Sequence, residues 1–496
     1  MSSITIGQAL HLAMQHHHAG RLKEAETIYR QVLTADPNHA DALHLLGVIA
    51  HQCNHHAPAV ELIQKSLAVH PNNAGAQNNL GEAYRSLGQN DEAIAAYKRS
   101  LEIDPRSTEA LGNLGLVYFN VGRVDEAIEQ YHKALAINPK MAQTLSNLGN
   151  AMLHKKELDR AMAAYDAAVA ADPMLADAHN NRGSALEHLD RLDEAYDEYR
   201  RATEINPRFP IACNNAANAA RRLSRWEEAR MWCEKALALD PNYEPARWNQ
   251  GLIELTMGYY AIGLPKYELR FVATPQRLPK DLFGLRWDGS PLDGKTVLLV
   301  GEQGLGDTWQ AARYVPMIRE RGGKVLIECT RSQVSMLGRL PGVEQAFANH
   351  TPRPSFDCFA PMMSLPLLFN TTITTIENRV PYLTAEPARV ESWRERLSFY
   401  GSGPKVGLVW HGSALPEPLR SCKLTDLAPL GRALGIKFFS LQVGEGSEEA
   451  ANPPAELNLT DLAKDVWDFE EMAACMMNLD LIISIDTAAA HLAGAL

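Results

Sequence analysis

The chain lacks the features of secreted, disulfide-stabilised and membrane-spanning proteins. Its seven cysteines are odd in number and none forms a CxxC pair, so neither a disulfide framework nor a zinc site is indicated. No stretch of about 18 apolar residues suggests a membrane span. The first residues contain no basic segment followed by a long apolar one, as a secretory signal would. These absences predict a cytoplasmic protein that does not span a membrane.

The sequence is also short of positive charge. It carries 48 lysines and arginines against 59 aspartates and glutamates, a net charge of −11 over 496 residues. This balance argues against a general nucleic-acid partner, which requires a basic surface. The histidines at 16–18 are adjacent, and adjacent side chains on a helix point in different directions, so no metal site is expected there.

What the chain has in abundance is a repeat of 34 residues. Prolines recur at 37, 71, 105, 139, 173, 207 and 241, and alanines at 25, 59, 93, 127, 161, 195 and 229. Glycines keep the same step at 47, 81, 115, 149, 183 and 251, with Ala217 in the gap, and tyrosines at 29, 97, 131, 165 and 199. Over about residues 4–275 this pattern resembles the tetratricopeptide repeat. The resemblance implies stacked helical hairpins that form a superhelix, whose concave groove holds a peptide or protein segment.

One repeat unit shows why these residue types recur. In the segment 91–105, Ala93, Tyr97 and Leu101 fall on one stripe of a helix. The small Ala93 lets a neighbouring helix approach, and Tyr97 fills the space beside it. Pro105 ends the hairpin, because a proline inside a helix removes a backbone hydrogen bond and clashes with the preceding turn.

Asparagines form a further register on the first helix of each pair, the helix that lines the groove in tetratricopeptide superhelices. They stand at Asn79, Asn113, Asn147, Asn181, Asn215 and Asn249. An asparagine offers both a donor and an acceptor, so a row of them suits the backbone of an extended peptide. The row resembles the asparagine ladder of eukaryotic O-GlcNAc transferase, which implies peptide binding. The alternative is that asparagine at this position serves helix packing.

The period of 34 ends after the proline at 241, and a stretch rich in proline, glycine and aspartate (274–295) predicts a linker. Short apolar runs then alternate with helical stretches such as 307–322 and 388–397. The expected strands are 296–300, 324–329, 405–410, 436–441 and 480–485. This alternation predicts parallel α/β structure in two Rossmann-like halves. The predicted domains are therefore a helical superhelix at 1–275 and the two halves at 276–400 and 401–496.

A glycine-rich loop follows the first of these strands. Gly301, Gly304 and Gly306 allow a tight strand-to-helix turn, at a helix N-terminus that suits an anion. A nucleoside-triphosphate loop would continue with Lys-Ser or Lys-Thr, whereas this one continues with Asp307 and Thr308. The dinucleotide fingerprint is also absent, because the glycines are spaced GxxGxG. On local sequence alone Asp307 is read as the cap of the next helix.

A second segment changes that interpretation. Asp486, Thr487 and His491 follow the last predicted strand, and such positions face the ligand crevice of an open α/β sheet. Together, GLGD at 304–307 and DTAAAH at 486–491 resemble the bacterial heptosyltransferase family. More closely, the whole chain resembles tetratricopeptide proteins with a heptosyltransferase-like domain, which are similar to O-GlcNAc transferases.

The resemblance implies an inverting, metal-independent glycosyltransferase of the glycosyltransferase B fold, with a nucleotide-diphosphate sugar as co-substrate and no cofactor. It makes Asp307 the general base for the acceptor hydroxyl. It assigns Asp486, Thr487 and His491 to the donor diphosphate, although Ala488 replaces the glycine of the family. The further donor-binding candidates are Arg420 (preferred to Lys423), His411, Ser413 and Gln442.

The chain ends at AHLAGAL, where the family continues with another strand, a contact segment and a closing helix. We therefore expect the second half to be incomplete, with an unfilled sheet edge and exposed apolar surface.

Three functions remain open from the sequence. The first is a glycosyltransferase that modifies proteins held in the repeat groove. The second is a scaffold whose transferase-like domain is inert, which the missing tail and Ala488 favour. The third is a sugar transferase that acts on a lipopolysaccharide or another glycan, with repeats that serve assembly.

Overall fold

The computed structural model describes residues 5–274, 278–279, 282, 285–412 and 420–496. The chain forms two compact units, Met1–Ala246 and Arg247–Leu496. This division differs from the sequence-based boundary at 275. The last helices before the linker belong to the second unit because they are tied to its first sheet, through the buried Arg270 and Glu302.

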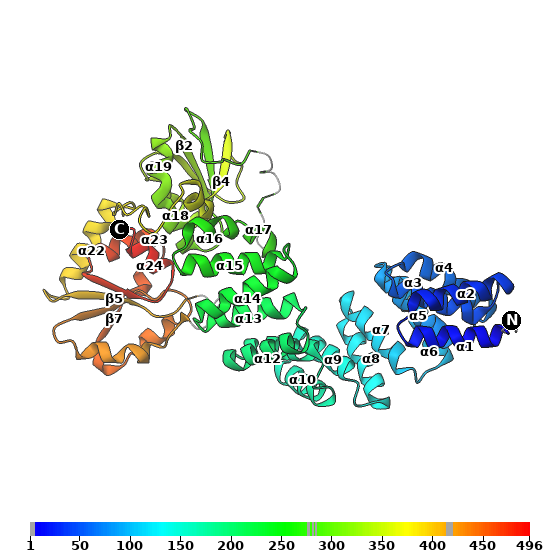
Figure 1. The fold of residues 1–496 in the computed structure, drawn as a ribbon. Coiled ribbons are helices and arrows are strands. Elements are labelled where there is room, and N and C mark those ends of the chain that lie inside the picture. Colours follow the sequence, from blue (N-terminus) through cyan, green and yellow to red (C-terminus); the bar gives the residue numbers. More distant parts are fainter. Residues whose placement is uncertain (1–4, 275–277, 280–281, 283–284, 413–419) are drawn as a thin grey trace. The chain divides into compact units, whose positions relative to one another are not determined.

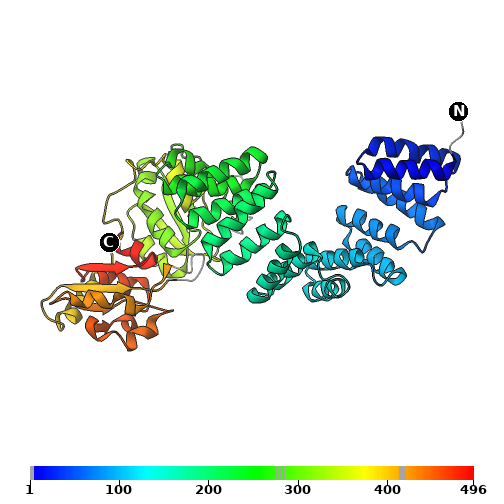
Figure 2. The ribbon, with the colours of Figure 1, turned by 60° about the horizontal axis from the view of Figure 1, so that its bottom comes forward.

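The first unit is built of antiparallel helix pairs that follow one another along the chain (Figures 1 and 2). The first helices are α1 (Ile6–His18), α3 (Ala40–Gln52), α5 (Ala74–Ser86), α7 (Thr108–Asn120), α9 (Ala142–His154), α11 (Ala176–His188) and α13 (Pro210–Arg222). The second helices are α2 (Leu22–Ala35), α4 (His56–Val69), α6 (Asn90–Ile103), α8 (Val124–Ile137), α10 (Leu158–Ala171), α12 (Leu192–Ile205) and α14 (Trp226–Leu239). The periodic sequence thus forms the helical repeats that it predicted.

The recurrent residues do what the pattern indicated. Each second helix ends at the residue directly before an Asp-Pro, Asn-Pro or His-Pro pair. Helix α6, for example, ends at Ile103, and Asp104 and Pro105 follow. The repeated tyrosines are fully buried, among them Tyr165. A Cβ at Gly149 would lie 2.5 Å from the Tyr165 ring, so only glycine lets the two helices of this hairpin approach.

The second unit begins with α15 (Glu244–Thr256), whose first residues belong to the first unit, and continues with α16 (Tyr260–Tyr267) and α17 (Arg270–Ala273). Two parallel four-stranded sheets follow, with the orders β3-β2-β1-β4 and β7-β6-β5-β8. The strands are β1 (Thr296–Val300), β2 (Lys324–Cys329), β3 (Val343–Ala348), β4 (Cys358–Pro361), β5 (Lys405–Val409), β6 (Lys437–Ser440), β7 (Leu459–Asp461) and β8 (Leu481–Ser484). The helices are α18 (Leu305–Ala311), α19 (Val315–Glu320), α20 (Val334–Gly338), α21 (Leu365–Leu368), α22 (Pro387–Ser398), α23 (Phe469–Met476) and α24 (Ala488–Ala493).

The five strands expected from apolar runs are all present, to within a residue or two. The sequence did not predict β3, β4 or β7, since β3 is partly exposed and the other two have only four and three residues. The helix expected at 307–322 is divided into α18, a 3-10 turn at 312–314 and α19, with Pro316 in the first turn of α19.

One hydrophobic core runs under both sheets of the second unit and joins them. Helices α18 and α24 pack against each other across the link, and α23 adds to it. Phe469 packs edge-on against Trp309, with ring centroids 5.6 Å apart, and Glu470 pairs with Arg339 at 2.6 Å. The two sheets are therefore held against each other by packing and by charge.

Strand β8 lies at the edge of the second sheet, and Leu481 on it is 53% exposed. A cavity of about 510 Å³ beside it is lined by Met477 and Leu496 among other apolar residues, and by Asp480 and Ser484. Among the described residues, no helix is long and apolar enough to cross a membrane.

Candidate functional site

The glycine loop after β1 is held close to its neighbours on both sides. The Gly301 N–H donates to the Glu328 carbonyl at 2.7 Å, and a Cβ at Gly301 would lie 3.0 Å from that oxygen. A Cβ at Gly306 would lie 2.5 Å from Cδ2 of His491, which belongs to α24 of the second sheet. Glycine at 306 thus permits direct contact between the loop and the DTAAAH segment.

Asp307 is not the N-cap that its local sequence indicated, because α18 begins earlier and its N-cap is Gly304. Asp307 is the third residue of α18, and its Oδ2 accepts a hydrogen bond of 2.8 Å from the Gly304 N–H, so it supports the start of the helix from inside. Burial raises the pKa of the Asp307 carboxyl above its ordinary value. The Gly304 bond and the nearby His491 and Arg420 lower it in part, while Asp486 raises it further. Asp307 is therefore a half-buried carboxylate, close enough to charged residues of the second sheet to feel their electrostatic field.

The second sheet presents its candidates around the end of β8. His491 Nε2 lies 3.4 Å from Asp486 Oδ1, and the Thr487 hydroxyl lies 3.1 Å from that of Ser484. Asp486 is largely exposed, whereas His491 is covered by the glycine loop. A Cβ at Gly412 would lie 3.1 Å from Thr487 and 3.3 Å from the Arg420 Nε, so the loop after β5 joins the same group.

Five predicted residues, from two distant sequence segments and an intervening loop, are therefore gathered at one place. They are Asp307, Arg420, Asp486, Thr487 and His491. The Asp307 carboxylate stands on one side of this cluster, and a guanidinium, a hydroxyl, an imidazole and the exposed carboxylate of Asp486 stand on the other. Chemically, such a group suits proton removal next to a bound anion.

Gln442 corrects the sequence-based expectation of a nucleoside contact. Its Oε1 accepts from the Trp410 and His411 N–H groups at 3.1 and 2.9 Å, and its Nε2 contacts the carbonyls of His411, Val443 and Glu445. The side chain is 3% exposed. Its hydrogen-bonding groups are thus used to join two loops, because a buried amide must find partners inside the protein.

The other two candidates of the loop after β5 are His411 and Ser413, which are not among the five residues gathered at the cluster. His411 has a buried Nδ1 with no hydrogen-bond partner among the described residues, and its Cβ lies close to Gly446. Ser413 lies outside the described residues.

The asparagine register of the first unit links neighbouring first helices. Asn79 Nδ2 lies 2.9 Å from His44 Nε2. Asn113, Asn181 and Asn215 donate to Asn78, Ser146 and Asn180 at 3.2, 3.2 and 2.9 Å. Each partner stands 35 residues earlier, on the first helix of the preceding repeat. The packing role that the sequence left open is thus observed for these amides.

The same register also faces a groove. Asn113, Asn147 and Asn181 line a cavity of about 530 Å³, together with Glu82, Glu109 and Asp177 among others. Asn147 Oδ1 accepts from Gln143 at 3.2 Å, and Asn249 is buried. Asparagine therefore both packs the repeats and contributes amide groups to the groove surface.

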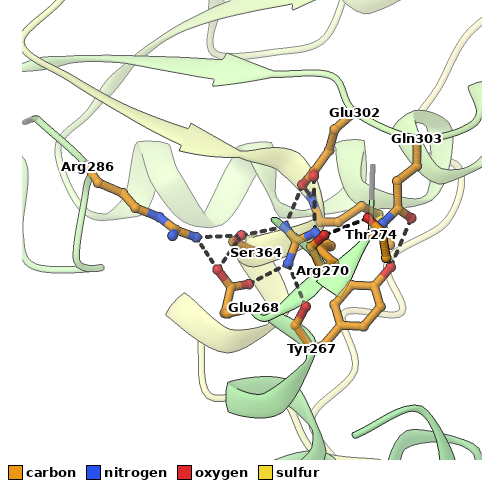
Figure 3. A network of polar contacts seen from close by, with 9 residues as sticks. Tyr267, Glu268, Arg270, Thr274, Arg286, Glu302, Gln303 and Ser364 are labelled. Carbon is orange, nitrogen blue, oxygen red and sulfur yellow. Dashed lines mark hydrogen bonds and ion pairs between the residues drawn. The ribbon is translucent and has the colours of Figure 1, made fainter. Parts of the chain in front are cut away.

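Sequence reasoning missed a buried polar network beneath the glycine loop (Figure 3). Arg270, 1% exposed, binds Glu302 through Nη2 and Nε at 2.6 and 3.1 Å and Glu268 at 2.8 Å. Its Nη2 also donates to the Ser364 hydroxyl at 2.8 Å. Tyr267 joins Gln303, the next residue of the loop. The signal available in the sequence was that Tyr267 stands two repeat lengths after Tyr199, in the tyrosine register.

Within the described residues, no group of three or more histidine, cysteine, aspartate or glutamate side chains is arranged to hold a metal ion.

Comparison with known proteins covers mainly the first unit. Tetratricopeptide-repeat family models match residues 16–80, 113–174, 176–209 and 198–244, and a model described as TPR repeat matches 81–122. Residues 16–244 are tetratricopeptide repeats. These tetratricopeptide repeats contain the helices from α2 to α14. They are the same segments in which proline, alanine, glycine and tyrosine recur every 34 residues.

Among curated proteins, Protein FlbA of Caulobacter vibrioides is 30% identical over 273 residues. The match covers 49% of this chain and 45% of FlbA, so it spans less than half the length of that relative.

Solved structures of tetratricopeptide proteins are similar to part of the chain. A protein of Parabacteroides merdae is 17% identical, with a TM-score of 0.43, over 50% of this chain and 98% of that one. A protein of Thermus thermophilus is 27% identical, with a TM-score of 0.33, over 37% of this chain and all of that one.

Proposed function

We propose that this chain is a glycosyltransferase that moves a sugar from a nucleotide-diphosphate donor to a protein segment held by its tetratricopeptide repeats. The observation that carries the proposal is the close approach of the glycine loop of the first sheet, at Gly306 beside Asp307, to His491 of the second, whose Nε2 lies 3.4 Å from Asp486. The two parallel sheets joined by one core are compatible with the Rossmann-like halves of the glycosyltransferase B fold.

The reaction requires a base for the acceptor hydroxyl and groups that stabilise the leaving diphosphate. Asp307 removes the proton of an acceptor hydroxyl while its oxygen attacks the anomeric carbon, so the new carbon–oxygen bond forms as the bond to the diphosphate breaks. The diphosphate leaves with the electron pair. Arg420, Thr487 and His491 offer it a positive charge and hydrogen bonds. The raised pKa of Asp307 supports the role of base, because an ordinary aspartate near 3.9 is a weak one.

The groove of the first unit supports a protein acceptor. Its asparagines carry partly exposed amide groups at a constant spacing, and amides bind peptide backbone whatever the sequence. The contacts between first helices hold these amides in place.

Binding and turnover test the enzymatic proposal. We would titrate the whole chain with UDP-N-acetylglucosamine, UDP-glucose, ADP-glucose and GDP-mannose, and measure nucleoside-diphosphate release. Asp307→Asn should still bind the donor that the wild type binds, and release should fall about 100-fold or more, as for other general bases. Glu344→Gln, an exposed carboxylate on β3, is the matched control and should leave release unchanged. Near-normal release by Asp307→Asn would eliminate this residue as the base.

The second candidate is a scaffold without catalytic activity. It is favoured by the hydrogen bond from Gly304 to Asp307, which gives this carboxylate a structural use. The likeness to FlbA suits both candidates. A scaffold predicts that none of the four nucleotide sugars binds, whereas the enzyme requires that one does.

The groove is tested separately, because the acceptor of the sugar could be a glycan instead of a protein. Once a donor is known, transfer to denatured protein is compared with transfer to free sugars. Replacing Asn147 and Asn181 by alanine should weaken transfer to protein several-fold and leave donor hydrolysis unchanged. Equal loss of both would show that the change had damaged the fold.

A further inference from the structure

The last helical hairpin before the linker contacts the glycine loop at two neighbouring residues, Glu302 and Gln303 (Figure 3). The contacts come from Arg270 on α17 and from Tyr267 at the end of α16. Both loop residues stand a few positions before Asp307. The hairpin is therefore placed to control how this carboxylate is presented.

The first contact is a buried ion pair. The Glu302 carboxylate is 6% exposed and accepts two hydrogen bonds from Arg270 and one of 3.1 Å from the Met363 N–H. A buried charge without its partner is strongly destabilising, so this contact fixes the backbone at Glu302. The ion pair therefore anchors the start of the glycine loop.

The second contact leads directly to Asp307. Gln303 has a φ of 60°, a left-handed conformation that glycine adopts more readily than other residues. Its side-chain amide meets the Tyr267 hydroxyl through Oε1 at 2.9 Å and Nε2 at 2.7 Å. The next residue is Gly304, whose N–H donates to the Asp307 carboxylate.

Tyr267 differs from the tyrosines of the earlier repeats. It stands at the same register as Tyr131 and Tyr165, which are fully buried within the helix pairs, whereas Tyr267 is only partly buried. Burial raises the pKa of Tyr267, and the nearby Asp307 raises it further, so the phenol keeps its proton. The Tyr165 hydroxyl donates within its own hairpin, to Asn150, whereas the Tyr267 hydroxyl meets a residue of the glycine loop.

We propose that Tyr267 is a positioning residue for Asp307, which acts through Gln303 and Gly304 and makes the last hairpin part of the catalytic machinery. The role rests on the proposed function, since it concerns the proposed base. Nothing in the packing of Tyr267 requires the hydroxyl, because the ring lies over the Arg270 guanidinium at 4.8 Å and would do so equally as phenylalanine.

The test uses the full chain and the donor found by titration, with nucleoside-diphosphate release as the readout. Tyr267→Phe should lower kcat about tenfold, as a small misplacement of a catalytic group does, and leave KM for the donor within about twofold. KM is spared because the donor residues lie on the second sheet. Tyr259→Phe, an exposed tyrosine on the preceding turn, is the matched control and should keep full kcat.

Rescue separates positioning from general damage. Gln303→Ala should lose as much kcat as Tyr267→Phe, because it removes the other half of the contact and keeps the unfavourable φ. Tyr267→Phe combined with Gln303→Gly should recover much of the loss, since glycine adopts this φ without the help of the phenol. No recovery, or a rise in KM without a fall in kcat, would overturn the proposal.

Hydrogen exchange of the backbone amides at 300–308 gives a readout that does not depend on turnover. The amides should exchange several-fold faster in Tyr267→Phe than in the wild type or in Tyr259→Phe. Unchanged exchange overturns the positioning role even if the enzyme is active. Faster exchange in a protein that binds none of the nucleotide sugars would instead reject the proposed function and with it the catalytic part of the inference.

Discussion

At the scale of single residues, Asp307 has an observed structural contact and the catalytic role that we propose for it. Its carboxylate accepts from the N–H of Gly304, the N-cap of α18, and burial raises its pKa although His491 and Arg420 lower it in part. A cap needs an acceptor oxygen, and a base needs a pKa closer to neutral. The hydrogen bond to Gly304 uses one carboxylate oxygen, and the pKa of Asp307 is shifted in the direction that a base needs, so the contact is compatible with both candidate functions.

Asp307→Asn should stabilise the fold at neutral pH. Asparagine keeps an oxygen for the Gly304 N–H but carries no charge to bury. Because the folded state raises the pKa, it holds the proton more tightly than the unfolded chain, and wild-type stability falls as pH rises through this range. The gain in Tm should be largest at neutral pH and vanish as pH falls to the ordinary aspartate value of about 3.9. Thermal unfolding from pH 3.5 to 7.5 measures it. A lower Tm for the variant at pH 7 would contradict the expectation.

The repeat tyrosines give a second residue-scale prediction. The Tyr131 hydroxyl is buried without a hydrogen-bond partner among the described residues, and burial raises its pKa. The Tyr165 hydroxyl instead donates to Asn150 at 2.7 Å. Tyr131→Phe should therefore leave the free energy of unfolding unchanged or slightly higher, while Tyr165→Phe should lower it by about 1 kcal/mol. Urea unfolding of the two matched variants decides this, and equal losses would show that water satisfies Tyr131.

At the scale of elements, the hairpins from α5 to α12 each place a glycine of the first helix against a tyrosine ring of the second. The Cβ of an alanine would lie 2.5 Å from the ring at Gly149 and also at Gly115. In the seventh helix pair, α13 and α14, the equivalent residues are Ala217 and Cys233, both fully buried. A smaller second residue thus accompanies the larger first one, as close packing requires.

Gly149→Ala should lower the free energy of unfolding by about 1 kcal/mol. Overpacking costs about 1–3 kcal/mol, and the better helix propensity of alanine returns about 1 kcal/mol at most. In a Tyr165→Cys background, which copies the Ala217–Cys233 pair, the same change should be neutral or stabilising. A double-mutant cycle by urea unfolding measures the coupling. Equal effects in both backgrounds would show that the tyrosine ring is not the obstacle.

At the scale of the whole molecule, the boundary between the units falls where contacts change rather than where the repeat ends. The segment from Arg247 to Thr274 continues the helical pattern of the repeats, yet it belongs to the unit that contains the sheets. Its buried Arg270 is the physical reason, because Glu302 of the glycine loop depends on that charge.

A fragment of residues 247–496 should therefore be more stable than a fragment of 276–496, by about 3–5 kcal/mol if the buried Glu302 loses its partner. Chemical unfolding of both fragments provides the comparison. The control is the longer fragment with Arg270→Met, which keeps the hairpin and removes the charge. If this control is as stable as its parent, packing of the hairpin rather than the ion pair holds the segment.

The repeats and the strands could be predicted because their signals are local. The spacing of 34 residues and apolar runs such as 296–300 show which side chains a segment must bury, whatever part of the protein it packs against. The gathering of Asp307 with His491 was inferred only through a family resemblance. Gln442 was misjudged because nothing local reveals that a glutamine near a strand end has five backbone groups within reach.

By itself the sequence determined the helical hairpins, the closing prolines and the registers of glycine, alanine and tyrosine, because a repeating pattern of side-chain size repeats the same packing along the chain. Only the tertiary structure decided that Tyr267 and Arg270 support the glycine loop and that the asparagine amides join successive helices. Those roles depend on which polar groups meet after burial. Residues far apart in the chain share no local signal that records such a meeting.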